Sequence, residues 1–149
     1  MQNKEPQLIL LGGLPGSGKS CQVERLRTDG WTVFDDFQKR AINNDPSFRM
    51  SRHLPELLQA LREGKKCVVA EVRLVTAEYR SDALRVLAHE IPALSVELRV
   101  FERDDPQCKH NINNSPDPRD APGRLGILRE FGPHHSLPQD AVKLSVWRP

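Results

Sequence analysis

The sequence lacks several features that would assign it to a well-defined class of protein. No apolar run approaches the length that spans a membrane, and residues 1–6 are polar and lack the apolar core of a secretory signal. The three cysteines, Cys21, Cys67 and Cys108, are widely spaced and form no C-x-x-C pair, so neither a disulfide framework nor a zinc site is expected. Because free thiols fit a reducing compartment, we expect a cytoplasmic protein without a membrane partner.

An excess of charge of one sign is also missing. The 149 residues hold 22 basic and 20 acidic side chains, and the net charge of +2 does not by itself favour a nucleic-acid or membrane partner. A basic cluster with interleaved aromatic residues is absent, and so is any internal repeat. The length and the ordinary composition, 38% hydrophobic and 28% charged, predict one globular domain over residues 1–149.

The sequence does contain one motif of high specificity. Gly13-Leu14-Pro15-Gly16-Ser17-Gly18-Lys19-Ser20 fits the pattern G-x-x-x-x-G-K-[ST] of the phosphate-binding P-loop. Its glycines permit backbone angles and close approaches that a Cβ would block, so the loop N–H groups can point inward at phosphate oxygens. Lys19 would reach the β- and γ-phosphates of a nucleotide, and Ser20 would hold Mg²⁺. The predicted nucleotide contacts are Gly13, Leu14, Pro15, Gly16, Ser17, Gly18, Lys19, Ser20 and Cys21.

Both flanks of the motif have the form that a P-loop requires. Residues 8–11 are a short, continuous apolar run, as a buried parallel strand should be. Residues 19–27 contain neither glycine nor proline, and Gly30 then marks the end of a helix. A strand, a loop and a helix in this order make a chance glycine-rich turn a poor alternative. Because the sequence has no N-K-x-D motif for guanine, ATP is a better candidate than GTP.

Acidic residues follow two further predicted strands. Residues 31–34 are β-branched and aromatic and lead into Asp35 and Asp36, and residues 67–70 are apolar and lead into Glu71. Ligands of open α/β sheets lie beyond the carboxyl ends of the strands, so these acids are expected at the same edge as the P-loop. One aspartate could act as a general base, and Glu71 could assist Mg²⁺. The alternative is that the acids simply end each strand in a turn.

The rest of the chain alternates helices with strands. Helices are predicted over residues 55–63, 77–90, 106–113 and 124–131, and strands over residues 94–101 and 141–147. Within the second of these helices, Tyr79 is expected in the core and Arg80 in solvent. Five strands that alternate with helices predict an α/β fold with a mostly parallel sheet, right-handed crossovers and helices on both faces.

A segment rich in proline, asparagine and aspartate separates the last two predicted helices. Residues 113–123 are not expected to form regular structure, which leaves either a linker or a mobile lid over residues 113–124. A lid over the phosphates of a phosphotransferase would carry an arginine that stabilises charge on the transferring group. Arg119 and Arg124 are the candidates, and the sequence does not separate them.

The layout resembles that of the P-loop nucleoside-phosphate kinases. Residues 12–20 look like the loop of the small bacterial and phage "AAA-family" P-loop kinases, which are related to polynucleotide 5′-hydroxyl kinases and zeta-toxin-like kinases. Residues 33–37, 101–111 and 144–147 are also similar. The resemblance implies that Lys19 and Ser20 serve ATP and Mg²⁺, and that Asp35 receives the proton of the acceptor hydroxyl. It further implies that Arg119 or Arg124 neutralises developing charge.

Two functions from different classes follow from these observations. The first is transfer of the γ-phosphoryl group of ATP to a hydroxyl of a small molecule or of a nucleic-acid 5′ end. The second is a nucleotide-binding regulatory or interaction module with little or no kinase activity. The sequence leaves the acceptor, the choice between Asp35 and Asp36, and the oligomeric state open.

Overall fold

A computed structural model of the chain describes residues 5–115 and 120–149. Its strands are β1 (Leu8–Gly12), β2 (Thr32–Asp35), β3 (Cys67–Ala70), β4 (Val96–Phe101) and β5 (Val142–Leu144). Within the described residues these five strands form one sheet in the order β2-β3-β1-β4-β5, and every neighbouring pair is parallel. The predicted α/β fold is confirmed, and the strand that leads into the P-loop lies at the centre of the sheet.

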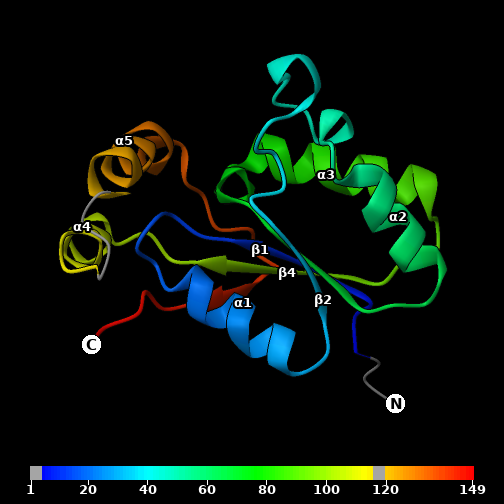
Figure 1. Ribbon diagram of the computed structural model, residues 1–149, viewed down its shortest axis with the longest axis horizontal. Coiled ribbons are helices and arrows are strands. Elements are labelled where there is room, and N and C mark those ends of the chain that lie inside the picture. Colours follow the sequence, from blue (N-terminus) through cyan, green and yellow to red (C-terminus); the bar gives the residue numbers. More distant parts are fainter. Residues whose placement is uncertain (1–4, 116–119) are drawn as a thin grey trace.

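Helices cover both faces of this sheet (Figure 1). Ile9 and Leu11 of β1 pack on one face against α1, whereas Leu8 and Leu10 pack on the other face against α2 and α3. Both faces of the central strand are therefore buried, as its continuous apolar run predicts. The helices are α1 (Lys19–Thr28), α2 (Leu54–Arg62), α3 (Ala77–Glu90), α4 (Asp105–Asn113) and α5 (Ala121–Phe131). Short 3₁₀ turns are η1 (Ile42–Asn44), η2 (Phe48–Met50), η3 (Val72–Val75) and η5 (Gly132–His134).

The last two helices lie side by side beyond the carboxyl ends of the strands (Figure 1). Leu14 of the P-loop is buried in a cluster with Cys108 and Ile112 of α4 and Leu128 of α5. α4 and α5 therefore pack on the P-loop as well as on each other. No helix within the described residues is both long and apolar enough to cross a bilayer.

The predicted irregular stretch is shorter than expected. α4 ends at Asn113, but α5 already begins at Ala121, so residues 121–123 are helical and the prediction for them is wrong. Proline is compatible with the first turn of a helix, where its missing N–H has no intrahelical partner, and Pro122 occupies that turn. Residues 116–119 of the predicted lid lie outside the described residues.

Arg80 is buried, which corrects the expectation that it is solvated. Its guanidinium donates hydrogen bonds to the carbonyl oxygens of Leu74 (3.0 Å) and Ser136 (2.9 Å), and to Ser136 Oγ (2.7 Å). These bonds join α3 to η3 and to the chain that follows η5. Tyr79, the neighbouring residue, is buried as predicted.

Candidate active site

The P-loop connects β1 to the first turn of α1. Gly16 and Gly18 have φ values of 82° and 108°, in the left-handed region that glycine tolerates. The N–H of Ser17 donates to the carbonyl oxygen of Leu14 at 3.1 Å and closes a turn within the loop. Gly18 is the N-cap of α1, and no side chain of the described residues caps this helix. The helix N-terminus therefore presents backbone N–H groups to an anion.

Close packing explains two of the glycines in this loop. A Cβ on Gly18 would lie 2.8 Å from the Cβ of Trp147, and a Cβ on Gly16 would overlap the carbonyl oxygen of Cys108. The loop is thus enclosed on one side by α4 and by the chain that follows β5. We call this the outer side of the P-loop.

A buried hydroxyl inside the loop lacks a partner. Ser17 is 1% exposed, and its Oγ accepts and donates no hydrogen bond among the described residues. A Cβ on Gly13 would lie 2.5 Å from this oxygen, which places the hydroxyl against the loop backbone. Because an unpaired buried hydroxyl is unfavourable, the loop is suited to a ligand that carries hydrogen-bond acceptors, such as phosphate oxygens.

The first residues of α1 leave their functional groups accessible. Lys19 is partly exposed, and Ser20 and Cys21 are exposed, so an ammonium, a hydroxyl and a thiol border the loop. Cys21 is exposed, whereas Cys67 and Cys108 are buried, and burial raises the pKa of each of these two thiols to about 11. Cys21 is therefore the thiol that reagents in solution would reach first.

Glu71 joins the ends of three strands. Its N–H donates to Leu11 O at 3.1 Å, beside the end of β1. Its carboxylate is buried and accepts backbone N–H bonds from Gln38 (2.9 Å) and Arg73 (2.7 Å). The two carboxylate oxygens thus hold the segments that follow β2 and β3 in place. The sequence did not predict this structural role. The proposed assistance to Mg²⁺ stays a prediction.

The two aspartates at the end of β2 are exposed but not equivalent. Val33 packs with the α1 face of the sheet and Phe34 with the opposite face, so the alternation of a strand puts Asp35 on the α1 side. The Oδ1 of Asp35 accepts the N–H of Asp36 at 2.9 Å. Asp36 has a φ of 49° and turns the chain away from the strand.

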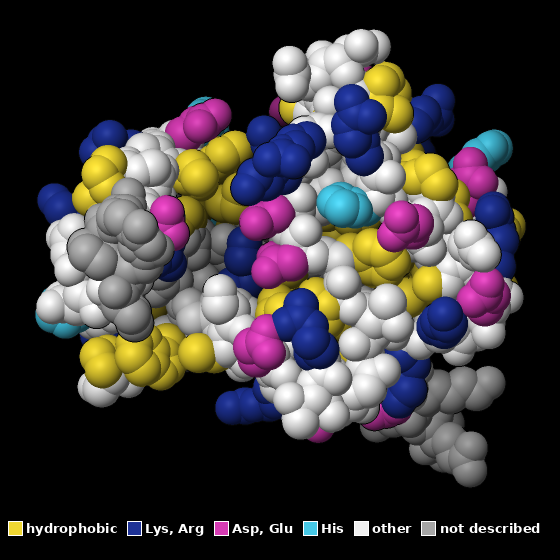
Figure 2. All heavy atoms as spheres, viewed as in Figure 1, with side chains coloured by type: hydrophobic (Ala, Val, Ile, Leu, Met, Phe, Trp, Pro, Cys, Tyr) yellow, Lys and Arg dark blue, Asp and Glu magenta, His cyan; other side chains and the backbone are white. Residues whose placement is uncertain are grey.

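A cavity of about 410 Å³ lies at the ends of β2 and β3. The charged groups in its lining are Asp36, Lys39, Arg40, Asp45, Glu71 and Arg73. Neither Lys39 nor Arg40 forms an ion pair with another described residue. Asp36, Arg40, Asn43 and Asn44 have left-handed backbone angles, and strained residues of this kind often cluster at functional sites. Figure 2 shows basic and acidic side chains gathered together on this face of the molecule.

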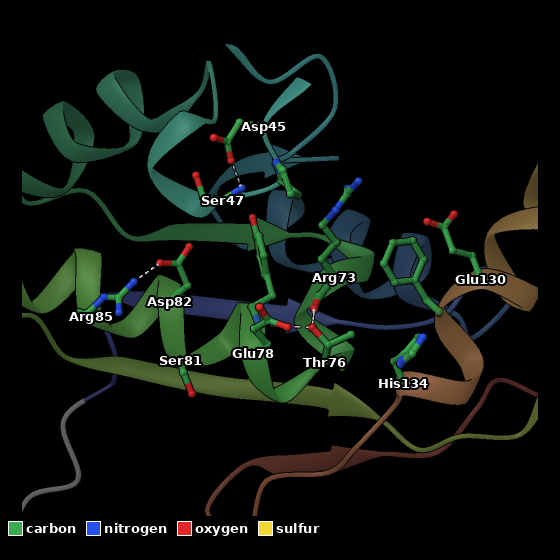
Figure 3. Close-up of a pocket in the computed structure, with 13 residues that line it drawn as sticks. Asp45, Ser47, Arg73, Thr76, Glu78, Ser81, Asp82, Arg85, Glu130 and His134 are labelled. Atoms are coloured by element: carbon green, nitrogen blue, oxygen red, sulfur yellow. Dashed lines mark hydrogen bonds and ion pairs between the residues drawn. The ribbon is translucent and has the colours of Figure 1, made fainter. Parts of the chain in front are cut away.

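A second cavity of about 770 Å³ adjoins the first, and Asp45 and Arg73 line both. In Figure 3 Asp45 lies on one side of it, Asp82 of α3 on another, and Glu130 and His134 on a third. We call the two cavities together the trough. Arg73 lies where they meet, so a ligand that extends along the trough would pass its guanidinium.

Comparisons with known proteins bear on the fold of the chain. No protein-family model matches the sequence. An uncharacterised protein of Acanthamoeba polyphaga mimivirus is 26% identical over 134 residues, which cover 88% of this chain and 87% of that protein. A gluconokinase from Sinorhizobium meliloti 1021 superposes with a TM-score of 0.58 at 17% identity, over 99% of this chain and 86% of that chain. The APS kinase CysC of Mycobacterium tuberculosis, in complex with AMPPNP and APS, gives 0.54 at 21% identity, over 99% and 92%.

The chain has the fold of the P-loop kinases. This finding confirms, at the level of the fold, the resemblance that the sequence indicates. In this P-loop kinase fold the trough lies on the sheet edge that also carries the P-loop, because β1, β2 and β3 are parallel and end together.

Of the two arginines predicted to act from the lid, the structure describes only Arg124. It is partly buried in the first half of α5, a helix that packs on α4 and η3. Arg119 lies outside the described residues. The charge-stabilising role of either arginine stays a prediction.

The donor set for Mg²⁺ is small. Within residues 5–115 and 120–149 no group of three or more His, Cys, Asp or Glu side chains could hold a metal ion. Proteins usually bind Mg²⁺ through one or two side chains together with substrate phosphates and water, so a Mg²⁺ site does not require such a group. The hydroxyl of Ser20, at the N-terminus of α1, is exposed, and its predicted role in holding Mg²⁺ stays a prediction.

Two hydrogen bonds hold the outer side of the P-loop, and the sequence did not predict them. Asn111 Nδ2 donates to Gly16 O at 2.8 Å, and the N–H of Trp147 donates to Ser17 O at 2.8 Å. Both acceptors are backbone carbonyls, and Asn111 is 95 positions from its partner. No sequence pattern marks such a contact.

Replacing Glu71 by glutamine should destabilise the protein by about 1–3 kcal/mol, because one of its two backbone donors would face an amide NH₂ group. Urea denaturation followed by circular dichroism measures the free energy of unfolding. Glu56→Gln, at an exposed position of α2, is the matched control and should change that free energy by less than about 0.5 kcal/mol. Equal losses in the free energy of unfolding for the two variants would show that the Glu71 carboxylate does not stabilise the strand ends.

Proposed function

We propose that this protein is an ATP-dependent phosphotransferase that moves the γ-phosphoryl group of ATP to a hydroxyl group. The acceptor would be a small molecule or a nucleic-acid 5′ end. The observation that carries the proposal is the presence, at one edge of the sheet, of both the P-loop and a charged trough. A module that only binds a nucleotide would not need a second cavity lined by charged side chains at the same edge of the sheet. The APS kinase with the same fold was solved with the nucleotide analogue AMPPNP, which supports ATP as the nucleotide here.

Each step of the proposed transfer is assigned to a residue of this chain. Lys19 would neutralise negative charge on the β- and γ-phosphates, and Ser20 would hold Mg²⁺, which offsets phosphate charge when it is bound. Asp35 would accept the proton of the acceptor hydroxyl as the hydroxyl oxygen bonds to the γ-phosphorus. The bond between that phosphorus and the bridging oxygen breaks, and ADP leaves. Arg124 or Arg119 would stabilise the charge on the transferring group.

The acceptor would bind in the trough. Its smaller cavity is lined by Lys39, Arg40 and Arg73, of which only Arg73 forms an ion pair among the described residues, with Glu71 at 3.6 Å. Unpaired cations beside a P-loop suit a polar or anionic hydroxyl compound. The three free cysteines support a reducing compartment such as the cytoplasm.

An acceptor screen for ADP release tests the proposal. The protein is incubated with ATP, Mg²⁺ and pools of polyols, sugars, nucleosides or 5′-hydroxyl oligonucleotides, and at least one pool should raise ADP formation above the acceptor-free rate. Lys19→Ala is the blank and should lower that stimulated rate by at least about a hundredfold, since it removes a cation that acts on the transferring phosphates. Binding of ATP without stimulation by any acceptor would instead favour a nucleotide-binding regulatory module.

A further inference from the structure

We propose that Asn111, together with the backbone N–H of Trp147, is a positioning element that holds the P-loop in its anion-binding conformation. We call this pair of groups the outer brace. The inference rests on the proposed binding of nucleotide by the P-loop, and it assigns a role to α4 and to the chain after β5. Neither group touches the transferring phosphate; both act through the loop.

The outer brace holds two successive peptide units of the loop. Asn111 Nδ2 donates to Gly16 O, and the N–H of Trp147 donates to Ser17 O, each at 2.8 Å. The same Asn111 amide donates to the carbonyl oxygen of Trp147, also at 2.8 Å. The two halves of the brace are therefore tied to each other as well as to the loop.

Fixing these carbonyls also fixes the N–H groups of the loop. In a trans peptide the C=O and N–H bonds point in opposite directions. With Gly16 O held on the outer side, the N–H of Ser17 faces Leu14 O and closes the turn at 3.1 Å. With Ser17 O held on the outer side, the N–H of Gly18 must point to the opposite side of the loop, away from α4 and Trp147. That direction is the one in which a P-loop N–H meets a phosphate oxygen.

The loop needs this support because a glycine flanks each of these peptides, and only the first peptide is also held from within the loop, by the bond from the Ser17 N–H to Leu14 O. Rotation of the peptide between Ser17 and Gly18 changes the φ of Gly18, and rotation of the preceding peptide changes the ψ of Gly16. Glycine adopts positive and negative φ almost equally well, so the glycine beside each peptide offers little resistance to its rotation. The contact from Trp147 to Ser17 O, outside the loop, holds the peptide that sets the φ of Gly18 at 108°.

A chain of polar contacts keeps the Asn111 amide in the required orientation. Gln107 Nε2 donates to Asn111 Oδ1 at 2.9 Å, so Nδ2 is left facing the loop. Arg148 donates to Gln107 Oε1 (2.8 Å) and to Asp104 Oδ2 (2.6 Å). Asp104 in turn caps α4 through the N–H of Gln107 at 3.1 Å. The amide of Asn111 is therefore oriented before any ligand arrives.

Titration calorimetry with MgADP tests the inference. Asn111→Leu removes the amide N–H groups that donate to Gly16 O and Trp147 O. Asn111→Asp replaces the amide with a carboxylate, which repels these two carbonyl oxygens. Each variant should weaken MgADP binding by about tenfold or more. The matched controls are Asn114→Leu and Asn114→Asp, at the exposed C-cap of the same helix, where the amide bonds to His110. Both controls should bind MgADP with the affinity of the unmodified protein.

The possible outcomes separate the inference from the proposed function. If the unmodified protein does not bind MgADP, the proposed function and this inference both fail. If it binds and the Asn111 variants bind equally well, the inference alone fails.

A spectroscopic measurement distinguishes positioning of the loop from a general loss of stability. In ¹H–¹⁵N correlation spectra without nucleotide, Asn111→Leu should shift or broaden the Ser17 and Gly18 signals. The signal of Val69, in the centre of β3, should not move. Unchanged Ser17 and Gly18 signals would overturn the inference even if the affinity had fallen.

Discussion

Replacing Asp35 by asparagine should lower the rate of phosphoryl transfer by about 10²–10⁴-fold, the usual contribution of a general base. Asparagine has nearly the shape of aspartate but cannot take a proton from the acceptor hydroxyl. The fold should be unaffected, because Asp35 is exposed and the asparagine Oδ1 can still accept the N–H of Asp36. MgADP affinity should therefore remain within about twofold. The measurement is the single-turnover rate with the acceptor that the screen identifies, beside a calorimetric affinity for MgADP.

Asp36→Asn is the natural companion variant, since it makes the same change of charge one position later. Asp36 lines the trough, so this variant should alter KM for the acceptor more than kcat. A larger loss of kcat in Asp36→Asn than in Asp35→Asn would assign the base to Asp36. Transfer at the unmodified rate in both variants would show that neither aspartate acts as a base.

Replacing Gly16 by alanine should destabilise the protein by about 2–5 kcal/mol. Two effects add: a left-handed φ of 82° is unfavourable for alanine by about 1–2 kcal/mol, and the new Cβ would overlap the carbonyl oxygen of Cys108. Forcing extra atoms into a packed site typically costs about 1–3 kcal/mol, and here the obstacle is the backbone of α4. The free energy of unfolding, measured with urea, is the relevant quantity.

Gly64→Ala is a closely matched control for this prediction. Gly64 also has a left-handed φ, of 83°, but a Cβ there would meet no atom within 4 Å. It should therefore cost only the backbone strain of about 1–2 kcal/mol. The difference between the two variants measures the close contact between the P-loop and α4. If both variants lose the same free energy, that contact contributes nothing to stability.

Features with local determinants could be predicted from the sequence. The P-loop is a contiguous pattern, and its neighbouring strand and helix are marked by an apolar run and by Gly30. The structure places α3 over Ala77–Glu90, the predicted range, because Thr76 caps the helix by accepting the N–H of Tyr79. The acids at the strand ends follow directly from the parallel order of β1, β2 and β3.

Features that depend on backbone carbonyls or amides far along the chain could not be predicted. Arg80 bonds to the carbonyl oxygen of Ser136, and Glu71 accepts the N–H of Gln38. Asn111 bonds to two carbonyls of residues far from it in sequence. Every residue has a carbonyl, so such partners leave no trace in residue type or spacing. The geometry of the site, and not only its composition, depends on these bonds.

The outer brace has a consequence for the order in which parts of the chain fold. The bond between Asn111 and Gly16 spans 95 positions, and contacts of such long sequence separation form late because closing a long loop is entropically unfavourable. The first 28 residues contain the whole P-loop motif, yet as a fragment they would lack the groups that orient its peptides. On the ribosome, α4 and Trp147 emerge long after that motif. We therefore expect the nascent chain to acquire affinity for a nucleotide only after Trp147 has emerged, and not when the P-loop first appears.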